Sequence, residues 1–470
     1  MSDLVTLPKG WVETKFDTIS FLITKGSTPT TYGYNYLKEG INFVKVENII
    51  NDQINIHSIN KFISKEANEF LKRSQLKEKD ILFSIAGTIG RTTIVKKENL
   101  PANTNQAIAI IRCPWQYLNF KFIKIILDSP ILFNSFSQNR RGVGMDNVSL
   151  GDIREMVFPL PPLNEQKRIV SKIEELFSKL DNVRDTLQKV KLQLVQYRQS
   201  LLKSAFEGKL TEEWRETNQG KIKPVSKLCE MIEEDSKSQV TPTNFSETEV
   251  SLPDTWCWIK LGEITDNHDG ERIPVNAKNR ESMKGKYPYY GASGIIDYVN
   301  KPIFNGKYLL IGEDGANLIS RSVPLAFIAE GKFWVNNHAH ILTTWGDIPL
   351  EFLSNYINSV RLTKWITGTA QPKLNQNNLK KIPVPVSPLE EQREIILQIE
   401  QGFSLIKNTE NITNTMLKQL DTLRSSILKQ AFEGKLVPQD PNDEPAEKLL
   451  ERIKEQKQSQ QTKAKSRGKK

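Results

Sequence analysis

A long stretch that occurs twice constrains the fold of this chain more than any other feature. It spans residues 162–210 and returns at residues 388–436. Both copies begin with the pattern Pro-Leu-x-Glu-Gln and end with the identical six residues Ala-Phe-Glu-Gly-Lys-Leu. Such an identity between residues of mixed type is not expected by chance, so the chain contains one module twice.

The first copy has the pattern of a long helix. Apolar residues recur at alternating steps of three and four from Ile173 to Leu201, which predicts a helix that packs a narrow apolar seam against another helix. A Pro-Pro pair opens this helix, and Gly208 closes it because glycine accepts left-handed geometry. As a straight helix, residues 162–206 would extend about 65 Å at ~1.5 Å per residue.

The second copy has a weaker seam. Gly402, Thr409 and Thr413 occupy positions where the first copy has apolar residues, and they would weaken a parallel homodimer of this helix. We therefore predict that the two long helices pack on each other within one chain. Their outer faces would remain for a partner protein.

The globular segments before the two long helices are also related, although they differ in length and in most residues. Both begin with Leu-Pro-x-x-Trp, and a proline-rich hinge joins each to its helix. The alignment pairs residues 7–11 with 252–256, 80–87 with 308–315, and 105–107 with 337–339. Two domains that share a backbone fold but differ in their surfaces are expected to recognise two different targets.

The predicted fold class is α+β. Runs of β-branched and aromatic residues at 42–46, 81–85 and 107–111 predict strands, and Gly, Asn and Pro between them predict turns. Residues 120–127 and 350–357 are expected to form helices packed on those strands. Each globular segment is thus predicted to be a mixed α/β domain on a twisted, mostly antiparallel sheet. The whole chain would form a pseudo-two-fold internal repeat.

The repeat defines the predicted domain boundaries. They are a first globular domain at 1–159, a first long helix at 160–207, a polar linker with a short helix at 208–250, a second globular domain at 251–385, a second long helix at 386–433, and a short helix with a basic tail at 434–470. The tail is expected to be disordered because it is rich in Gln and Lys.

Composition narrows the class of protein. The chain has 470 residues, of which 38% are hydrophobic, and this suffices for about three domains with buried cores. No apolar run approaches the ~20 residues of a membrane span, and no signal peptide is evident. The three cysteines lack CxxC spacing, which favours a reducing cytoplasm and neither a disulfide framework nor a zinc site. The net charge of +10 favours a polyanionic partner.

Motifs for catalysis are missing from the sequence. It contains no GxxxxGK[ST] phosphate loop and no Asn/Asp-Pro-Pro-Tyr/Phe motif of adenine methyltransferases. His338 and His340 have no further residues at metal-ligand spacing, so no metal site is predicted. Glu313 and Asp314 could form half of a nuclease carboxylate pair, but a turn is the favoured interpretation. These features predict a chain without catalytic residues of its own.

The motifs in this order resemble the specificity (S) subunit of type I restriction-modification systems, over residues 4–455. The resemblance implies that the globular segments are target recognition domains, each reading half of a split DNA sequence. It also implies that the two long helices pack antiparallel, as an intramolecular coiled coil, and set the spacer. It implies a cytoplasmic complex with two modification (methyltransferase) subunits and with restriction (nuclease and translocase) subunits. N6-adenine methylation and ATP-dependent cleavage would occur only in that complex, with S-adenosylmethionine, ATP and Mg bound to the partner subunits and no cofactor in this chain.

Polar residues beside glycine turns are the candidate DNA contacts, because Arg, Asn and Gln distinguish bases while Lys, Ser and Thr hold phosphates. In the first domain they are Lys25, Ser27, Thr28, Thr88, Arg91, Asn103, Asn105, Gln106, Arg140 and Arg141. In the second domain they are Arg272, Tyr289, Tyr290, Ser293, Arg321, Trp334, Asn336, Asn337, His338 and Lys373. For each residue, a structural turn or a solvated face is the alternative.

Two other functions stay open at this point. One is a fused nuclease or methyltransferase in which the helices space two catalytic domains, and the missing motifs count against it. The other is a coiled-coil scaffold that joins other proteins. A scaffold would protect no split motif in DNA footprinting, which separates it from a specificity subunit.

Overall fold

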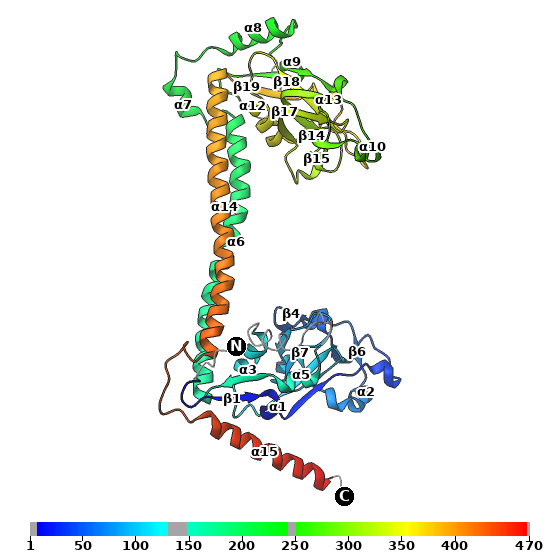
Figure 1. The fold of residues 1–470 in the computed structure, drawn as a ribbon, viewed down its shortest axis with the longest axis vertical. Helices are drawn as coiled ribbons and strands as arrows, with labels where there is room; N and C mark the ends of the chain where they lie inside the picture. Colours follow the sequence, from blue (N-terminus) through cyan, green and yellow to red (C-terminus); the bar gives the residue numbers. More distant parts are fainter. Residues whose placement is uncertain (1–6, 130–147, 243–250, 468–470) are drawn as a thin grey trace. The chain divides into compact units, whose positions relative to one another are not determined.

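The computed structural model describes residues 7–129, 148–242 and 251–467 (Figure 1). The chain forms two compact units. Unit 1 comprises Met1–Thr186 and Thr415–Lys470, and unit 2 comprises Leu187–Asn414. Each unit holds one globular domain and one half of each long helix. Within the described parts of the chain, no helix has the length and apolar character needed to cross a membrane.

Domain 1, residues 7–160, is built on a four-stranded antiparallel sheet in the order β2-β10-β7-β8. Smaller sheets, β6-β3-β9 and β4-β5, come from the segments between these strands, and β1 pairs with β11 to join the two ends of the domain. The elements are β1 (Val12–Lys15), β2 (Leu22–Lys25), β3 (Ile41–Val44), β4 (Ile49–Ile50), β5 (Gln53–Ile54), β6 (Phe62–Ile63), β7 (Ile81–Ser84), β8 (Thr92–Ile94), β9 (Ala102–Thr104), β10 (Ile108–Arg112) and β11 (Val157–Leu160), with α1 (Phe16–Ile19), α2 (Lys65–Phe70), α3 (Phe120–Asp128) and α5 (Leu150–Glu155).

Domain 2, residues 251–386, repeats this plan on a larger sheet. Its six strands have the order β13-β18-β16-β17-β14-β15, and only the β14–β17 pairing is parallel among the described strands of this sheet. Strand β12 pairs with β19 as β1 does with β11. The elements are β12 (Cys257–Lys260), β13 (Thr265–Asn267), β14 (Lys284–Gly291), β15 (Gly294–Val299), β16 (Phe304–Gly312), β17 (Ala326–Val335), β18 (Ala339–Thr344) and β19 (Pro383–Val386), with α9 (Leu261–Ile264), α10 (Ala277–Glu281), α11 (Asn317–Ser320), α12 (Leu350–Ser359) and α13 (Gln376–Leu379).

The predicted class and its main elements are confirmed. The runs at 42–46, 81–85 and 107–111 form β3, β7 and β10, and the two predicted helices are α3 and α12. In both domains the sheets are mostly antiparallel, and the order β2-β10-β7 corresponds to β13-β18-β16. The amphipathic α3 buries its apolar face on the sheet, as its helical spacing predicts.

One part of the predicted alignment between the domains is wrong by one residue. Asn105 Oδ1 accepts a hydrogen bond from the backbone N of Ala107 at 3.2 Å, and Asn336 Oδ1 accepts one from the backbone N of His338 at 2.8 Å. Asn105 therefore corresponds to Asn336 and not to Asn337. Two successive asparagines in domain 2 made either register possible in the sequence, and only the turn geometry distinguishes them.

The long helices are α6 (Leu163–Phe206) and α14 (Leu389–Phe432). Within unit 1, Arg184 pairs with Asp421 and Arg424 pairs with Asp181. Within unit 2, Lys191 Nζ donates to Asn414 Oδ1 at 3.0 Å. Residue numbers rise along one helix as they fall along the other, so the two helices are antiparallel in each unit, as predicted.

The interrupted seam of α14 has a local explanation. Gly402 lies so close to Leu201 of α6 that an added Cβ would clash with the Leu201 side chain. Thr413 is buried and donates its hydroxyl to Thr409 O at 2.7 Å, so its polar group is satisfied inside the helix. The predicted seam is nonetheless incomplete, because Val183 is exposed, as are Tyr197, Met416 and Leu423.

Each domain is completed by helices from the other repeat. The core of domain 1 includes Ala431 and Phe432 of α14, and Ile453 of α15 (Ala446–Arg467). The core of domain 2 includes Ala205 and Phe206 of α6, and Ile232 of α8 (Val225–Ser236). Helix α7 (Glu212–Thr217) lies in the linker between α6 and α8. The repeated Ala-Phe pairs are thus core residues.

The prediction of a disordered tail after the short helix is wrong over residues 456–467, which continue helix α15. Two contacts with domain 1 hold this continuation. Gln116 Nε2 donates to Gln456 Oε1 at 2.8 Å, and Lys457 Nζ donates to Asp17 O at 2.6 Å. Packing of the first turns of α15 against the domain 1 core outweighs the low apolar content of the sequence that follows.

Candidate nucleic-acid interface

In domain 1, three loops meet at one end of the main sheet. Gly26, after β2, lies so close to the backbone of the loop before β10 that a Cβ would clash with it. Thr28 donates its hydroxyl to Gln106 Oε1, and the backbone N of Ile85, after β7, donates to Ala107 O at 2.8 Å. We refer to these loops, residues 25–28, 85–91 and 105–107, as edge 1.

Edge 1 brings together most of the residues predicted as DNA contacts in domain 1. Ser84 ties the β7–β8 loop together, since its hydroxyl donates to Thr88 O at 2.6 Å and accepts from the backbone N of Arg91 at 2.7 Å. The Arg91 guanidinium also donates to Ile49 O at 3.1 Å. The residues of edge 1 that were predicted are Lys25, Ser27, Thr28, Thr88, Arg91, Asn105 and Gln106.

Three other predictions for domain 1 lie elsewhere. Asn103 is fully buried, and its side-chain amide donates a hydrogen bond to Asn68 Oδ1 at 2.9 Å. Its side chain therefore has a structural role and is not accessible to DNA in this structure. Arg140 and Arg141 lie outside the described residues.

The corresponding loops of domain 2 meet in the same way. The backbone N of Glu313, after β16, donates to His338 O at 2.8 Å, and the backbone N of Leu374 donates to Glu313 O at 2.8 Å. The second bond has a counterpart in domain 1, where the backbone N of Val148 donates to Ile85 O at 2.9 Å. We refer to residues 266–272, 313–314, 336–340 and 373–374 as edge 2.

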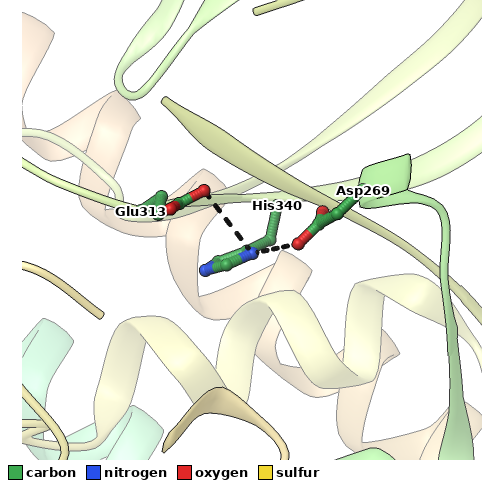
Figure 2. A group of neighbouring side chains, drawn as sticks. All are labelled: Asp269, Glu313 and His340. Atoms are coloured by element: carbon green, nitrogen blue, oxygen red, sulfur yellow. Dashed lines mark hydrogen bonds and ion pairs between the residues drawn. The ribbon is translucent and has the colours of Figure 1, made fainter. Parts of the chain in front are cut away.

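A network of ion pairs lies at edge 2, and Figure 2 shows three of its members, Asp269, Glu313 and His340. His340 Nδ1 lies 2.6 Å from Asp269 Oδ2 and 3.9 Å from Glu313 Oε2. Arg272 Nη1 donates to Glu313 Oε2 at 2.8 Å, and Lys373 Nζ lies 3.1 Å from Glu313 Oε1. His340 is almost completely buried, and the loops that carry its partners are far apart in sequence.

The geometry gives the His340 ring two protons. Its Nε2 lies 2.7 Å from Leu374 O, which can only accept a hydrogen bond, so Nε2 carries a proton. Its Nδ1 faces Asp269, whose other oxygen accepts from the backbone N of Ile341 at 3.0 Å. A carboxylate that accepts both bonds requires a proton on Nδ1 as well. His340 is therefore an imidazolium held between two acceptors.

The charges of the network also act on the carboxyl groups. Burial alone would raise the pKa of Asp269, but the hydrogen bond from His340 and the nearby Arg272 outweigh it, and the pKa is lowered. The pKa of Glu313 is lowered in the same way, because its bonds to Arg272 and Lys373 and the charge of His340 exceed the effect of burial. Both groups are thus stabilised as carboxylates.

Asp269, Glu313 and His340 also present atoms within 4.8 Å of one another, a grouping that sequence spacing did not reveal. Two side chains of the chain face both carboxylates as cations, His340 and Arg272, and the Arg272 guanidinium lies 3.5 Å from Asp269 Oδ2 in addition to its bond with Glu313. The chain therefore supplies its own cations here. Asp314 is paired with His338 at 2.7 Å, so the Glu313–Asp314 pair is engaged in ion pairs and does not form a free nuclease dyad.

The remaining predictions for domain 2 divide into two groups. Asn336, Asn337 and His338 lie on the turn before β18 within edge 2, although Asn336 is buried. The residues that lie outside edge 2 are Tyr289, Tyr290, Ser293, Arg321 and Trp334.

Most of the predicted residues that lie outside edge 2 have structural roles. Tyr289 and Trp334 are buried, and Trp334 Nε1 donates to Ile273 O at 2.7 Å. Arg321 donates to Ile357 O at 3.1 Å and closes the C-terminal end of α12. Tyr290 packs on Phe327, and Ser293 is exposed in the β14–β15 turn.

The two edges offer different chemistry. Edge 1 presents hydroxyl and amide groups with Lys25 and Arg91, whereas edge 2 presents histidines, carboxylates, Arg272 and Lys373. Hydroxyl, amide and charged groups on loops are the groups that read base edges and hold phosphates. Sequence reasoning missed Asp269 and His340. The available signal was that three of the four histidines lie between residues 268 and 340.

Comparisons with known proteins agree with this architecture. Residues 8–192 and 253–418 match the family model described as type I restriction modification DNA specificity domain. The chain is 28% identical over 340 residues to the type I restriction enzyme EcoDI specificity subunit of Escherichia coli, covering 68% of this chain and 72% of that protein. It is 23% identical over 481 residues to the StySPI specificity subunit of Salmonella potsdam, covering 95% and 96%.

Solved structures show the same fold. A chain from a structure of the type I R-M system aligns with a TM-score of 0.67 at 18% identity, covering 92% of this chain and 100% of that chain. The HsdS subunit from Thermoanaerobacter tengcongensis aligns with a TM-score of 0.57, also at 18% identity, covering 92% and 98%.

Proposed function

The chain belongs to the type I restriction-modification DNA specificity family, and from this premise we propose that it is the noncatalytic subunit that selects the DNA sequence for a type I system. The observation that carries the proposal is the duplicated domain with one skeleton and two chemically different loop edges. A bipartite DNA target, with one half-site for each domain, accounts for both the duplication and the difference.

The antiparallel helices support a role in setting the spacer between the half-sites. In each unit, the end of one long helix is built into the domain core, through Phe432 in domain 1 and Phe206 in domain 2. Helices joined to the domains by buried aromatic residues fix each domain more firmly than a flexible linker would. Half-sites one helical turn apart, roughly 34 Å, fit within helices of about 65 Å.

The outer faces of the long helices suit partner subunits. Leu192 of α6 and Leu405 and Ile412 of α14 are exposed apolar residues of unit 2, with 68%, 59% and 60% of their surface accessible. Exposed apolar side chains on a rigid helix pair are typical of docking sites. We assign these faces to two modification subunits in a cytoplasmic complex with restriction subunits. In that complex, S-adenosylmethionine, ATP and Mg would bind to the partners and none to this chain.

The test is a comparison of host methylomes with and without this chain. A methylated split motif that disappears with the chain is the expected result. Exchange of residues 1–159 for the corresponding domain of another family member should then change one half of the motif and leave the other. Methyl transfer or strand cleavage by the purified chain alone would overturn the noncatalytic assignment, and a change in both halves would overturn the assignment of one half-site to each domain.

A further inference from the structure

Three histidines of the chain gather at edge 2, each beside a carboxylate. His268 Nδ1 lies 2.7 Å from Glu271 Oε1, and its Nε2 lies 3.7 Å from Asp266 Oδ2. His338 Nδ1 lies 2.7 Å from Asp314 Oδ2, and the third is the His340–Asp269 pair. The fourth histidine, His57, is exposed in domain 1.

His268 and His338 differ from His340 in the surroundings of the ring nitrogen that does not face a carboxylate, Nε2. The Nε2 of His268 lies 2.9 Å from the hydroxyl of Thr343, which can either donate or accept a hydrogen bond. His338 is about half exposed, with 49% of its side-chain surface accessible. The partners of the His268 ring thus accommodate a donor or an acceptor at Nε2 and His338 is half open to solvent, whereas both ring nitrogens of His340 face acceptors.

The protons on these two rings decide the charge of edge 2. Its ion pairs join five carboxylates, those of Asp266, Asp269, Glu271, Glu313 and Asp314, to three fixed cations, Arg272, Lys373 and the His340 imidazolium. Five negative and three positive charges leave −2 when His268 and His338 are neutral, and zero when both carry two protons. The net negative charge repels phosphates in the first state, and this repulsion is absent in the second.

Domain 1 lacks this arrangement at equivalent positions. The turn geometry aligns Glu313 and Asp314 with Ile85 and Ala86, and it aligns His338 and His340 with Ala107 and Ala109. Four charged or titratable residues of edge 2 therefore have apolar counterparts in domain 1. Edge 1 instead carries the exposed cations Lys25 and Arg91.

We propose that domain 2, unlike domain 1, takes up protons on His268 and His338 when it binds DNA, so that recognition of the second half-site is linked to pH. The inference rests on the proposed DNA-binding function and specifies how one of the two sites is regulated. Histidine is the side chain suited to this role, because its ordinary titration falls between about pH 5 and pH 8. Binding that takes up one proton changes affinity about tenfold per pH unit where the ring is neutral.

The experiment uses the full chain and duplexes that carry the bipartite target identified by methylome sequencing. Three duplexes are compared at constant ionic strength, with both half-sites, with the first alone, and with the second alone. Between about pH 6 and about pH 8, affinity for the duplex with only the second half-site should fall at least tenfold. Affinity for the duplex with only the first half-site should change less than about twofold.

A variant tests the residues directly. The double substitution Asp314→Ala and His338→Ala gives domain 2 the residues that domain 1 carries, and it should remove about half of the pH dependence for the second half-site. His57→Gln in domain 1 is the matched control and should leave both dependences unchanged. Thermal melting of each variant checks that it is folded.

Calorimetry of the unmodified chain in two buffers of different ionisation enthalpy counts the protons without any variant. Uptake of about two protons with the second half-site and about none with the first is expected. Equal uptake for both half-sites, or none for either, would overturn the inference while leaving the proposed function intact. If no split target exists, the proposed function itself fails.

Discussion

Trp11 Nε1 donates a hydrogen bond to Glu165 Oε2 at 2.9 Å, and Trp256 Nε1 donates one to Glu391 Oε2 at the same distance. Each pair joins the Leu-Pro-x-x-Trp motif at the start of a domain to the Pro-Leu-x-Glu-Gln motif at the start of the long helix that follows it. Gly208 adopts a left-handed φ of 74° against Pro253. The three repeated motifs therefore meet at the junction of domain and helix, which explains their repetition.

The two junctions should differ in strength. Glu391 also accepts from Thr211 Oγ1 at 2.7 Å and from Arg215 Nε at 2.9 Å, whereas the other oxygen of Glu165 accepts only from Gln439 among its described partners, at 2.8 Å. Glu391→Ala removes the carboxylate partner of the partly buried Arg215 guanidinium and leaves the buried Trp256 indole without an acceptor, and it should cost about 3–5 kcal/mol. Glu165→Ala should cost about 1–3 kcal/mol. Chemical denaturation followed by tryptophan fluorescence measures both, and equal losses would contradict the ranking.

Arg272 should stabilise domain 2 in a pH-dependent manner. Arg272→Met keeps much of the side-chain volume but removes a guanidinium that pairs with both carboxylates and leaves His340 and Lys373 as their remaining cations, so it should cost about 1.5–3 kcal/mol at neutral pH. The pKa values of Asp269 and Glu313 are lowered in the folded protein. Their stabilisation is therefore fully present above the ordinary carboxyl pKa near ~4 and is lost as pH falls through the lowered values.

The measurement for this prediction is the difference in melting temperature between wild type and Arg272→Met across the acid range. That difference should shrink below about pH 4, because protonation removes the carboxylates that Arg272 pairs with. Arg361→Met replaces an exposed arginine of the same domain and should change stability by no more than ~0.5 kcal/mol. A constant difference at every pH would show that Arg272 acts through packing and not through charge.

Gly402 should be required for the close approach of the long helices in unit 2. Gly402→Ile places a branched side chain against Leu201 and should destabilise the chain by about 1–3 kcal/mol through overpacking. Leu201→Ala in the same chain provides room and should restore part of the loss. A double-mutant cycle measures the coupling, and additive effects would rule out direct contact as the cause.

Pro349 leaves a buried acceptor in domain 2 without a partner. In domain 1, the backbone N of Asn119 donates to Gln166 Oε1 at 2.9 Å, while Pro349 at the same place before α12 has no N–H to offer Gln392. Gln392 Oε1 is buried with no hydrogen bond to the described residues. Pro349→Asn supplies both this donor and an N-cap, and should raise stability by about 1 kcal/mol.

The reciprocal substitution in domain 1 provides the control for this prediction. Asn119→Pro removes the donor to Gln166 and the side-chain cap of α3, and should lower stability by about 2 kcal/mol. Thermal melting of both variants tests the pair. A loss of stability with Pro349→Asn would show that the fixed φ of proline contributes more than the missing hydrogen bond.

Much of the fold follows from local sequence patterns. The two long helices are evident because a 3.5-residue apolar period, opening prolines and closing glycines act over a few residues each. Strands β3, β7 and β10 are likewise marked by β-branched runs between turn residues. The duplication is visible because the junction motifs use the same buried contacts twice, as Trp11 with Glu165 and Trp256 with Glu391.

Only the tertiary structure decides which loop residues form a site. Asp269 and His340 are 71 positions apart, and they meet only after β13, β16 and β18 have paired. Asn103 and Tyr289 are polar residues near turns, yet both are buried in the fold. Helix α15 continues beyond residue 455 because it packs against domain 1. The periodicity of apolar residues in the sequence depends only on residues close to one another along the chain. Burial and ion pairing depend on loops that are distant in sequence and that come together only when the sheet forms.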